Sequence, residues 1–155
     1  MNLILFIDML FVFTIYNVYI ACNYGFLSSI SVSYYYLPEK RNWLFLAFCW
    51  LYAIPAVMLS TNGFMFFSGG LICFVGVASA FRIPNVGVIH QVSALTAIVL
   101  SQLAILFCYH LYILNVIMVL ATVVLFLLRD KFAQWMYFLE VIAFMLISIA
   151  LGLQL

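Results

Sequence analysis

Six long apolar runs follow one another along the chain, separated by short stretches that contain charged residues, Gly, Pro or Asn. A helix needs roughly 17 to 25 apolar residues to cross the hydrocarbon core of a bilayer, and each run has about this length. We therefore predict an all-α fold, a polytopic transmembrane helical bundle that forms a single domain over residues 1–155. The predicted spans cover residues 3–22, 43–59, 64–81, 89–109, 111–128 and 132–153.

The weakest of the five breaks lies at His110, where no helix-breaking residue interrupts the apolar pattern. A single helix over the 40 residues 89–128 would be about 60 Å long at ~1.5 Å per residue, which is twice the thickness of the hydrocarbon core. Two spans that meet at His110 fit this run better.

Residues 23–37 fit neither a span nor a loop, because they are too polar for lipid and too apolar for water. Their three consecutive tyrosines precede Pro38 and a charged triplet, as expected of an anchor at headgroup level. Since lipid offers the serines no hydrogen-bond partner, we expect this interfacial or partly re-entrant segment to be covered by helices or to line a wet cavity. The candidate interfacial pocket consists of Ser29, Ser31, Tyr34 and Tyr35.

Composition supports the membrane prediction and excludes some partners. Apolar residues make up 70% of the chain and charged residues 6%, with a mean hydropathy of +1.34. The nine charged side chains could not cover such a surface in water. A net charge of +1 gives no basic field for nucleic acid. The four cysteines stand alone in apolar stretches, which is typical of small packing residues.

All five basic residues fall in the first, third and fifth connections, which a chain of six spans places on one side of the membrane. These residues are Lys40, Arg41, Arg82, Arg129 and Lys131. The positive-inside tendency predicts that this side is cytoplasmic. We expect a multi-pass protein, integral to a bacterial inner membrane.

Two spans carry stripes of small residues at helical spacing. The third span has Gly69, Cys73, Gly76 and Ala80, and the fourth has Ser93, Ala97, Ser101 and Ala104. Small faces let helix backbones approach closely in lipid. We therefore predict that the third and fourth spans pack tightly against each other.

Ionisable residues inside a span are costly and are the first candidates for function. Arg82, His90 and Glu140 fall at similar depth and form the candidate polar cluster, whereas Asp8 and His110 fall near the other side. The Glu140 carboxylate could pair with Arg82 or accept a hydrogen bond from His90. A structural clamp between spans is favoured over a catalytic or ligand-binding role.

Several cofactor chemistries do not fit the spacing. His90 and His110 are 20 residues apart, about 30 Å along a helix, so they cannot share a metal ion or face each other across a haem. Lys40 and Lys131 lie in connections, where they cannot form a Schiff base inside the bundle. We expect no metal and no cofactor.

Three stretches resemble an uncharacterised family of small bacterial six-span membrane proteins: SISVSYYYLPEKRNWLF (29–45), GVIHQVSAL (87–95) and FLEVIAFMLISIALG (138–152). The chain departs from the family in its short connections, in having Phe-Leu where the family has Trp-Leu before the acid, and in lacking a Lys after the last helix. The resemblance implies a membrane fold without a known activity. It covers Ser29, Ile30, Ser31, Tyr34, Tyr35, Arg41, Asn42, His90, Ser93, Ala94 and Glu140.

Three functions remain open. The first is the binding of a membrane lipid, or of a membrane-protein partner or second copy, by the serine-tyrosine segment and the polar cluster. The second is a lipid hydrolase that uses Ser29 or Ser31 with His90 and Glu140, although no nucleophile-elbow motif is present. Alkaline ceramidases are similar in their inventory of Ser, His and acid, but this chain lacks their several histidines. The third is a subunit of a larger membrane complex.

Overall fold

A computed structural model describes residues 2–81 and 85–155, and within them the chain is all-α, without any strand. The prediction of an all-helical fold is confirmed. The elements are α1 (Asn2–Tyr24), α2 (Ser33–Tyr36), the 3-10 helix η1 (Glu39–Arg41), α3 (Trp43–Leu59), α4 (Gly63–Ala80), α5 (Val86–Phe107), α6 (Tyr112–Leu127) and α7 (Trp135–Gly152).

Five of the described helices are long and apolar enough to cross a membrane: α1, α3 (with η1), α4, α5 and α7. The helix in the fifth predicted span, residues 111–128, is shorter than expected. Helix α6 has 16 residues, about 24 Å at ~1.5 Å per residue, against a hydrocarbon core of about 30 Å. The predicted break at His110 is confirmed, because α5 ends at Phe107 and His110 turns the chain with a positive φ of 56°.

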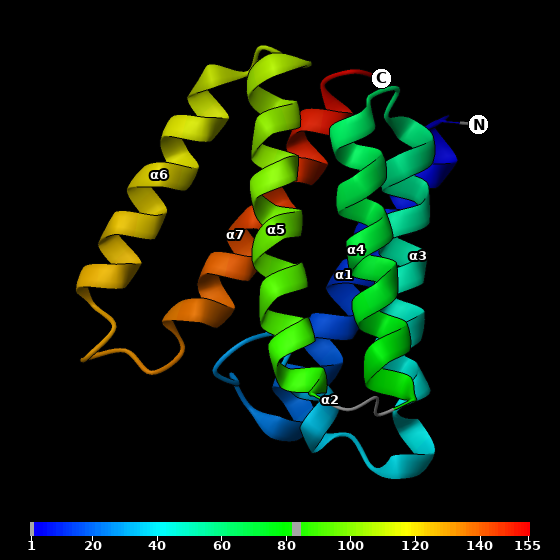
Figure 1. Ribbon diagram of the computed structural model, residues 1–155, viewed down its shortest axis with the longest axis vertical. Coiled ribbons are helices and arrows are strands. Elements are labelled where there is room, and N and C mark those ends of the chain that lie inside the picture. The colour runs from blue at the N-terminus through cyan, green and yellow to red at the C-terminus, as the bar shows by residue number, and fades with distance from the viewer. Residues whose placement is uncertain (1, 82–84) are drawn as a thin grey trace.

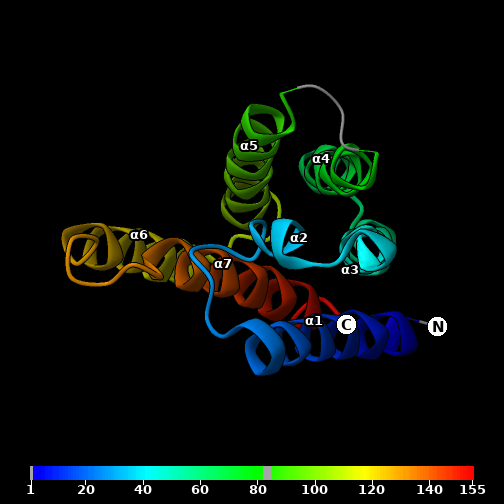
Figure 2. The same cartoon turned by 90° about the horizontal axis from the view of Figure 1, so that it is seen from below.

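The helices form two groups, and the segment that contains α2 lies between them (Figure 2). Seen from the end, α1, α7 and α6 lie in a row, and α3, α4 and α5 form an arc on one face of that row (Figure 2). Helix α2 lies between the two groups, and α6 lies at the outer end of the row (Figures 1 and 2). The termini of the chain lie together at one end of the bundle (Figure 1).

The connections that carry the described basic residues share the other end. The segment from α1 to α3, which contains Lys40 and Arg41, lies at the bottom of Figure 1. The segment from α6 to α7, which contains Arg129 and Lys131, lies at the lower left of Figure 1. Arg82 falls outside the described residues. These four charges therefore lie toward the end of the bundle opposite the termini (Figure 1), and the side of the membrane that this end faces stays a prediction.

Helix α4 packs on both of its neighbours, but with different faces. Ser68 Oγ lies 2.7 Å from Ser101 Oγ and donates to the Ala97 carbonyl at 2.8 Å, so α4 and α5 are closely packed as predicted. The prediction that the small-residue stripe of α4 faces α5 is wrong for its glycines. A methyl group on Gly69 or Gly76 would collide with side chains of α3, because the stripe faces α3 rather than α5.

Candidate functional site

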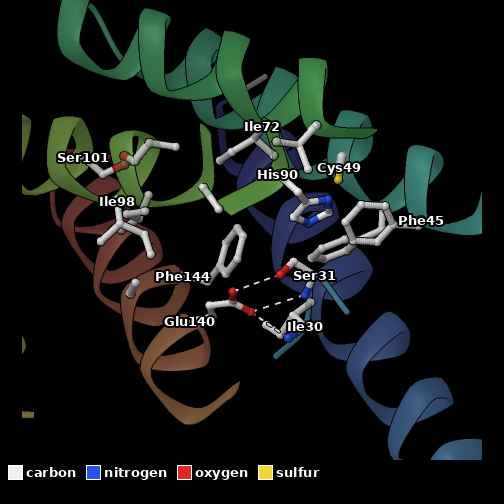
Figure 3. A pocket seen from close by; sticks show the side chains of 16 residues that line it. Ile30, Ser31, Phe45, Cys49, Ile72, His90, Ile98, Ser101, Glu140 and Phe144 are labelled. Carbon is white, nitrogen blue, oxygen red and sulfur yellow. Dashed lines mark hydrogen bonds between the residues drawn. The ribbon is translucent and has the colours of Figure 1, made fainter. Parts of the chain in front are cut away.

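Glu140 joins α7 to the segment between α1 and α2 (Figure 3). One carboxylate oxygen, Oε2, accepts from the backbone N–H groups of Ile30 at 2.6 Å and Ser31 at 3.4 Å. The other, Oε1, accepts from Ser31 Oγ at 3.2 Å. Three donors directed at one buried carboxyl group replace hydrogen bonds to water that it loses on burial.

The same segment is held by α7 and by its own serines. The Tyr137 N–H, in the first turn of α7, donates to the Ser28 carbonyl at 3.0 Å, so the segment caps the N-terminus of this helix. Ser29 Oγ accepts from the Val32 N–H at 3.0 Å and lies 2.9 Å from Ser31 Oγ. These contacts satisfy backbone groups that lipid could not satisfy, as expected for a covered, non-helical segment.

Helix α1 fixes the far side of the segment. Tyr16 Oη lies 2.6 Å from the buried Ser33 Oγ. Tyr137 Oη, from α7, donates to Asn17 Oδ1 of α1 at 2.9 Å. Residues 28–33 are therefore positioned by two helices from the two ends of the chain.

His90, in the first turns of α5, is buried next to this segment. Its ring stacks on Tyr34 and Phe45, with centroids 5.6 and 5.5 Å apart. His90 Nδ1 lies 3.2 Å from Ser79 Oγ of α4. Among the described residues, His90 Nε2 has no hydrogen-bond partner although it is buried.

The three tyrosines do not act as one headgroup anchor. Tyr35 and Tyr36 are exposed as predicted, whereas Tyr34 is only 4% exposed and turns inward onto His90. The α-helical turn of α2 causes this difference, because consecutive residues of a helix point about 100° apart. Three residues of the candidate interfacial pocket, Ser29, Ser31 and Tyr35, line a cleft between α5, α6 and α7.

Two spaces meet at Ser31, His90 and Glu140. The first is a small apolar cavity of about 50 Å³ inside the bundle, shown in Figure 3. The second is a cleft of about 910 Å³ bounded by α5, α6, α7 and residues 28–35. Along α5 the cleft is lined from Gly87 to Leu103. The polar groups gather at one end of the cleft, and apolar side chains line most of the rest.

A second polar contact lies deeper in the cleft, between α5 and α6. Asn115 Nδ2 donates to the Gln102 carbonyl at 2.9 Å and to Gln102 Oε1 at 3.1 Å. Gln102 also lines the cleft. It is 12 residues beyond His90, which places it about 18 Å further along α5.

The predicted polar cluster is partly assembled, with different partners. His90 and Glu140 line the same spaces, but Glu140 bonds to Ile30 and Ser31, and His90 bonds to Ser79. Arg82, which was expected to pair with Glu140, lies outside the described residues. Sequence reasoning missed Ser79 and the two backbone amides. Ser79 had a signal, since it falls near the end of the third span, at the depth of His90.

The geometry does not form the serine relay of the hydrolase hypothesis. In such a relay a histidine lies between the nucleophile and the acid, whereas here Ser31 donates directly to Glu140 and His90 faces Ser79. Within the described residues, no three His, Cys, Asp or Glu side chains come together as a metal site would need. Comparison with protein-family models, curated proteins and solved structures gives no match for this chain.

Proposed function

We propose that this membrane protein binds a single membrane lipid in the cleft between α5, α6 and α7. The observation that carries the proposal is the cleft itself, about 910 Å³ in volume, apolar over most of its length and polar at the end near Ser31, His90 and Glu140. Small-molecule sites in proteins have this size and this distribution of a few polar groups on an apolar lining.

The shape of the cleft matches an amphiphile. Its polar end lies beside residues 28–35, at the same end of the bundle as the described basic connections, where headgroups lie in a bilayer (Figure 1). From His90 the lining continues for about 18 Å along α5 to the level of Gln102. An acyl chain would lie along this apolar stretch with its headgroup at the serine segment.

Access from the bilayer is provided by α6. Only Leu114 and Met118 of this helix are buried, and it lies at the edge of the bundle (Figure 2). Its residues Met118, Thr122 and Phe126 form one wall of the cleft. A lipid can therefore enter sideways between α5 and α6 without leaving the membrane.

The test fills the cleft and compares the result with a substitution on the other side of α5. Ile98 lines both spaces, so Ile98→Trp should occupy the room of the acyl chain. Thr96 is exposed and lies two residues away, about 200° around the helix, so Thr96→Trp adds the same ring outside the cleft.

Each protein is purified in a mild detergent, and native mass spectrometry measures the fraction of molecules that retain lipid. We expect wild type and Thr96→Trp to retain one lipid per chain, and Ile98→Trp to lose most of it. Equal lipid retention by Ile98→Trp and Thr96→Trp, with both proteins folded, would overturn the proposal.

A further inference from the structure

The polar end of the cleft is rich in hydrogen-bond acceptors. Ser79 Oγ has one proton, and it donates that proton to the Val75 carbonyl at 2.8 Å. We assign the oxygen as acceptor in its contact with His90 Nδ1 at 3.2 Å, because the shorter bond to Val75 uses the hydroxyl proton, and this assignment places the imidazole proton on Nδ1. In the neutral ring, Nε2 then has a lone pair and no proton.

His90 Nε2 is an unsatisfied polar atom at this end of the cleft. It is buried, it has no hydrogen-bond partner among the described residues, and His90 lines both the cavity and the cleft. A buried polar atom without a partner costs free energy that a ligand recovers by supplying the partner. The partner that a lone pair needs is a hydrogen-bond donor.

The charges of the residues that line the cleft also favour a ligand that donates hydrogen bonds. The Glu140 carboxylate lines the cleft, and no Lys or Arg is among the described lining residues. An anionic headgroup would meet a carboxylate and a lone pair, which is unfavourable in a dry site. A cationic headgroup is not required, because Glu140 already accepts three hydrogen bonds from the protein.

We infer that the lipid bound in the cleft has an uncharged hydroxyl headgroup, of the kind found in acylglycerols, and that one hydroxyl donates to His90 Nε2. The inference rests on the proposed function and gives its ligand class. His90 is the residue that selects the headgroup. Ser79 is a positioning residue, because it holds the imidazole proton on Nδ1.

The experiment compares headgroups on one acyl chain. A photoreactive monoacylglycerol is crosslinked to the purified protein in detergent, and unlabelled monooleoylglycerol, oleate or oleoyl lysophosphatidic acid competes for the site. We expect monooleoylglycerol to compete at concentrations at least about tenfold lower than the two anions, a difference of about 1.4 kcal/mol. Crosslinks should map to the cleft-lining part of α5.

Two variants test the role of the histidine. His90→Phe keeps a ring between Tyr34 and Phe45 but has no acceptor, so monooleoylglycerol should lose its advantage over oleate. Ser79→Ala removes the acceptor of the Nδ1 proton, and the ring can then carry its proton on Nε2 and donate. The preference should shift toward oleate, which a purely structural role of Ser79 would not produce.

The outcomes separate this inference from the proposed function. If oleate or lysophosphatidic acid competes as well as monooleoylglycerol in wild type, and Ile98→Trp abolishes crosslinking, the cleft binds lipid and the headgroup inference is wrong. If crosslinking is the same in wild type and Ile98→Trp, the proposed function itself fails. An unchanged headgroup preference in both His90→Phe and Ser79→Ala also overturns the inference.

Discussion

The Glu140 carboxylate accepts a hydrogen bond of 2.6 Å from the backbone N–H of Ile30, which lies 110 residues earlier in the chain. The contact connects the last helix to the non-helical segment that follows the first. It also places the costliest side chain of α7 where backbone donors would otherwise be unsatisfied in lipid. Each group therefore offsets part of the desolvation cost of the other.

Replacing this carboxylate by an amide should destabilise the bundle. In Glu140→Gln the amide oxygen can still accept from the Ile30 and Ser31 N–H groups, but as a neutral acceptor it forms weaker bonds. The amide nitrogen would face Ser31 Oγ, whose hydroxyl would then have to accept instead of donate. We expect the free energy of unfolding to fall by about 1 to 3 kcal/mol. Reversible unfolding in mixed micelles with increasing SDS measures this change.

The control makes the same change at the other end of the bundle. Asp8 is exposed on α1, so Asp8→Asn should leave the free energy of unfolding within about 0.5 kcal/mol of wild type. Ser31→Ala removes the 3.2 Å bond to Glu140 and the 2.9 Å contact with Ser29 but keeps both backbone bonds, so its stability should fall between the two. Equal stability of Glu140→Gln and Asp8→Asn would show that the carboxylate does not hold the segment.

The sequence predicts those parts of this site that a single side chain marks by its own chemistry. Glu140 and His90 could be selected because ionisable side chains in lipid need partners, and the serine segment because it is too polar for a span. The partners of Glu140 could not be found, since two of the three are backbone amides, which carry no sequence signal. The large cleft depends on the position of α6, which an apolar pattern does not give.

The sequence also could not predict which neighbouring helix the small-residue stripe of α4 faces. Periodicity shows which residues share a helix face, but not which neighbour that face meets. Gly69 meets α3 because the side chain of Val57 fills the space above it. The face toward α5 is marked instead by Ser68, whose hydroxyl bonds to Ala97 and Ser101.

Alanine in place of two adjacent glycines of α4 should have different effects on the stability of the bundle. A methyl group at position 69 would overlap Val57 Cγ2, so Gly69→Ala should force α3 and α4 apart. Nothing lies within 4 Å of the corresponding position at Gly70. Because alanine favours a helix over glycine, Gly70→Ala should be neutral or stabilising by up to about 1 kcal/mol.

We expect Gly69→Ala to lower the free energy of unfolding by about 1 to 3 kcal/mol, as overpacked cores do. SDS unfolding of the two variants side by side checks the prediction. Similar stabilities for Gly69→Ala and Gly70→Ala would argue against the close packing of α3 on α4.

The contact between Gln102 and Asn115 should act as a unit that holds α6 on α5. Asn115→Leu leaves Gln102 Oε1 without its donor, and Gln102→Leu removes one of the two acceptors of Asn115. Each single variant should lose about 1 kcal/mol of stability, a usual value for such bonds between membrane helices. The double variant should lose less than the sum, because no polar side chain is then left unpaired.

A double-mutant cycle by SDS unfolding measures this coupling. Strict additivity of the two single losses would mean that the side chains do not interact. The lipid content of the same proteins, measured by native mass spectrometry, shows in addition whether an untethered α6 opens the cleft.

The two exposed cysteines report the orientation of the bundle. Cys22 lies near the end of α1, at the end of the bundle where the described basic connections lie, and Cys108 follows α5 at the opposite end (Figure 1). The positive-inside tendency places Cys22 toward the cytoplasm and Cys108 toward the outside. A thiol reagent that does not cross membranes should therefore label Cys108 in intact cells and Cys22 only after permeabilisation. Cys108→Ser and Cys22→Ser assign each signal to its residue, and labelling of Cys22 alone in intact cells would reverse the orientation and place the polar end of the cleft in the outer leaflet.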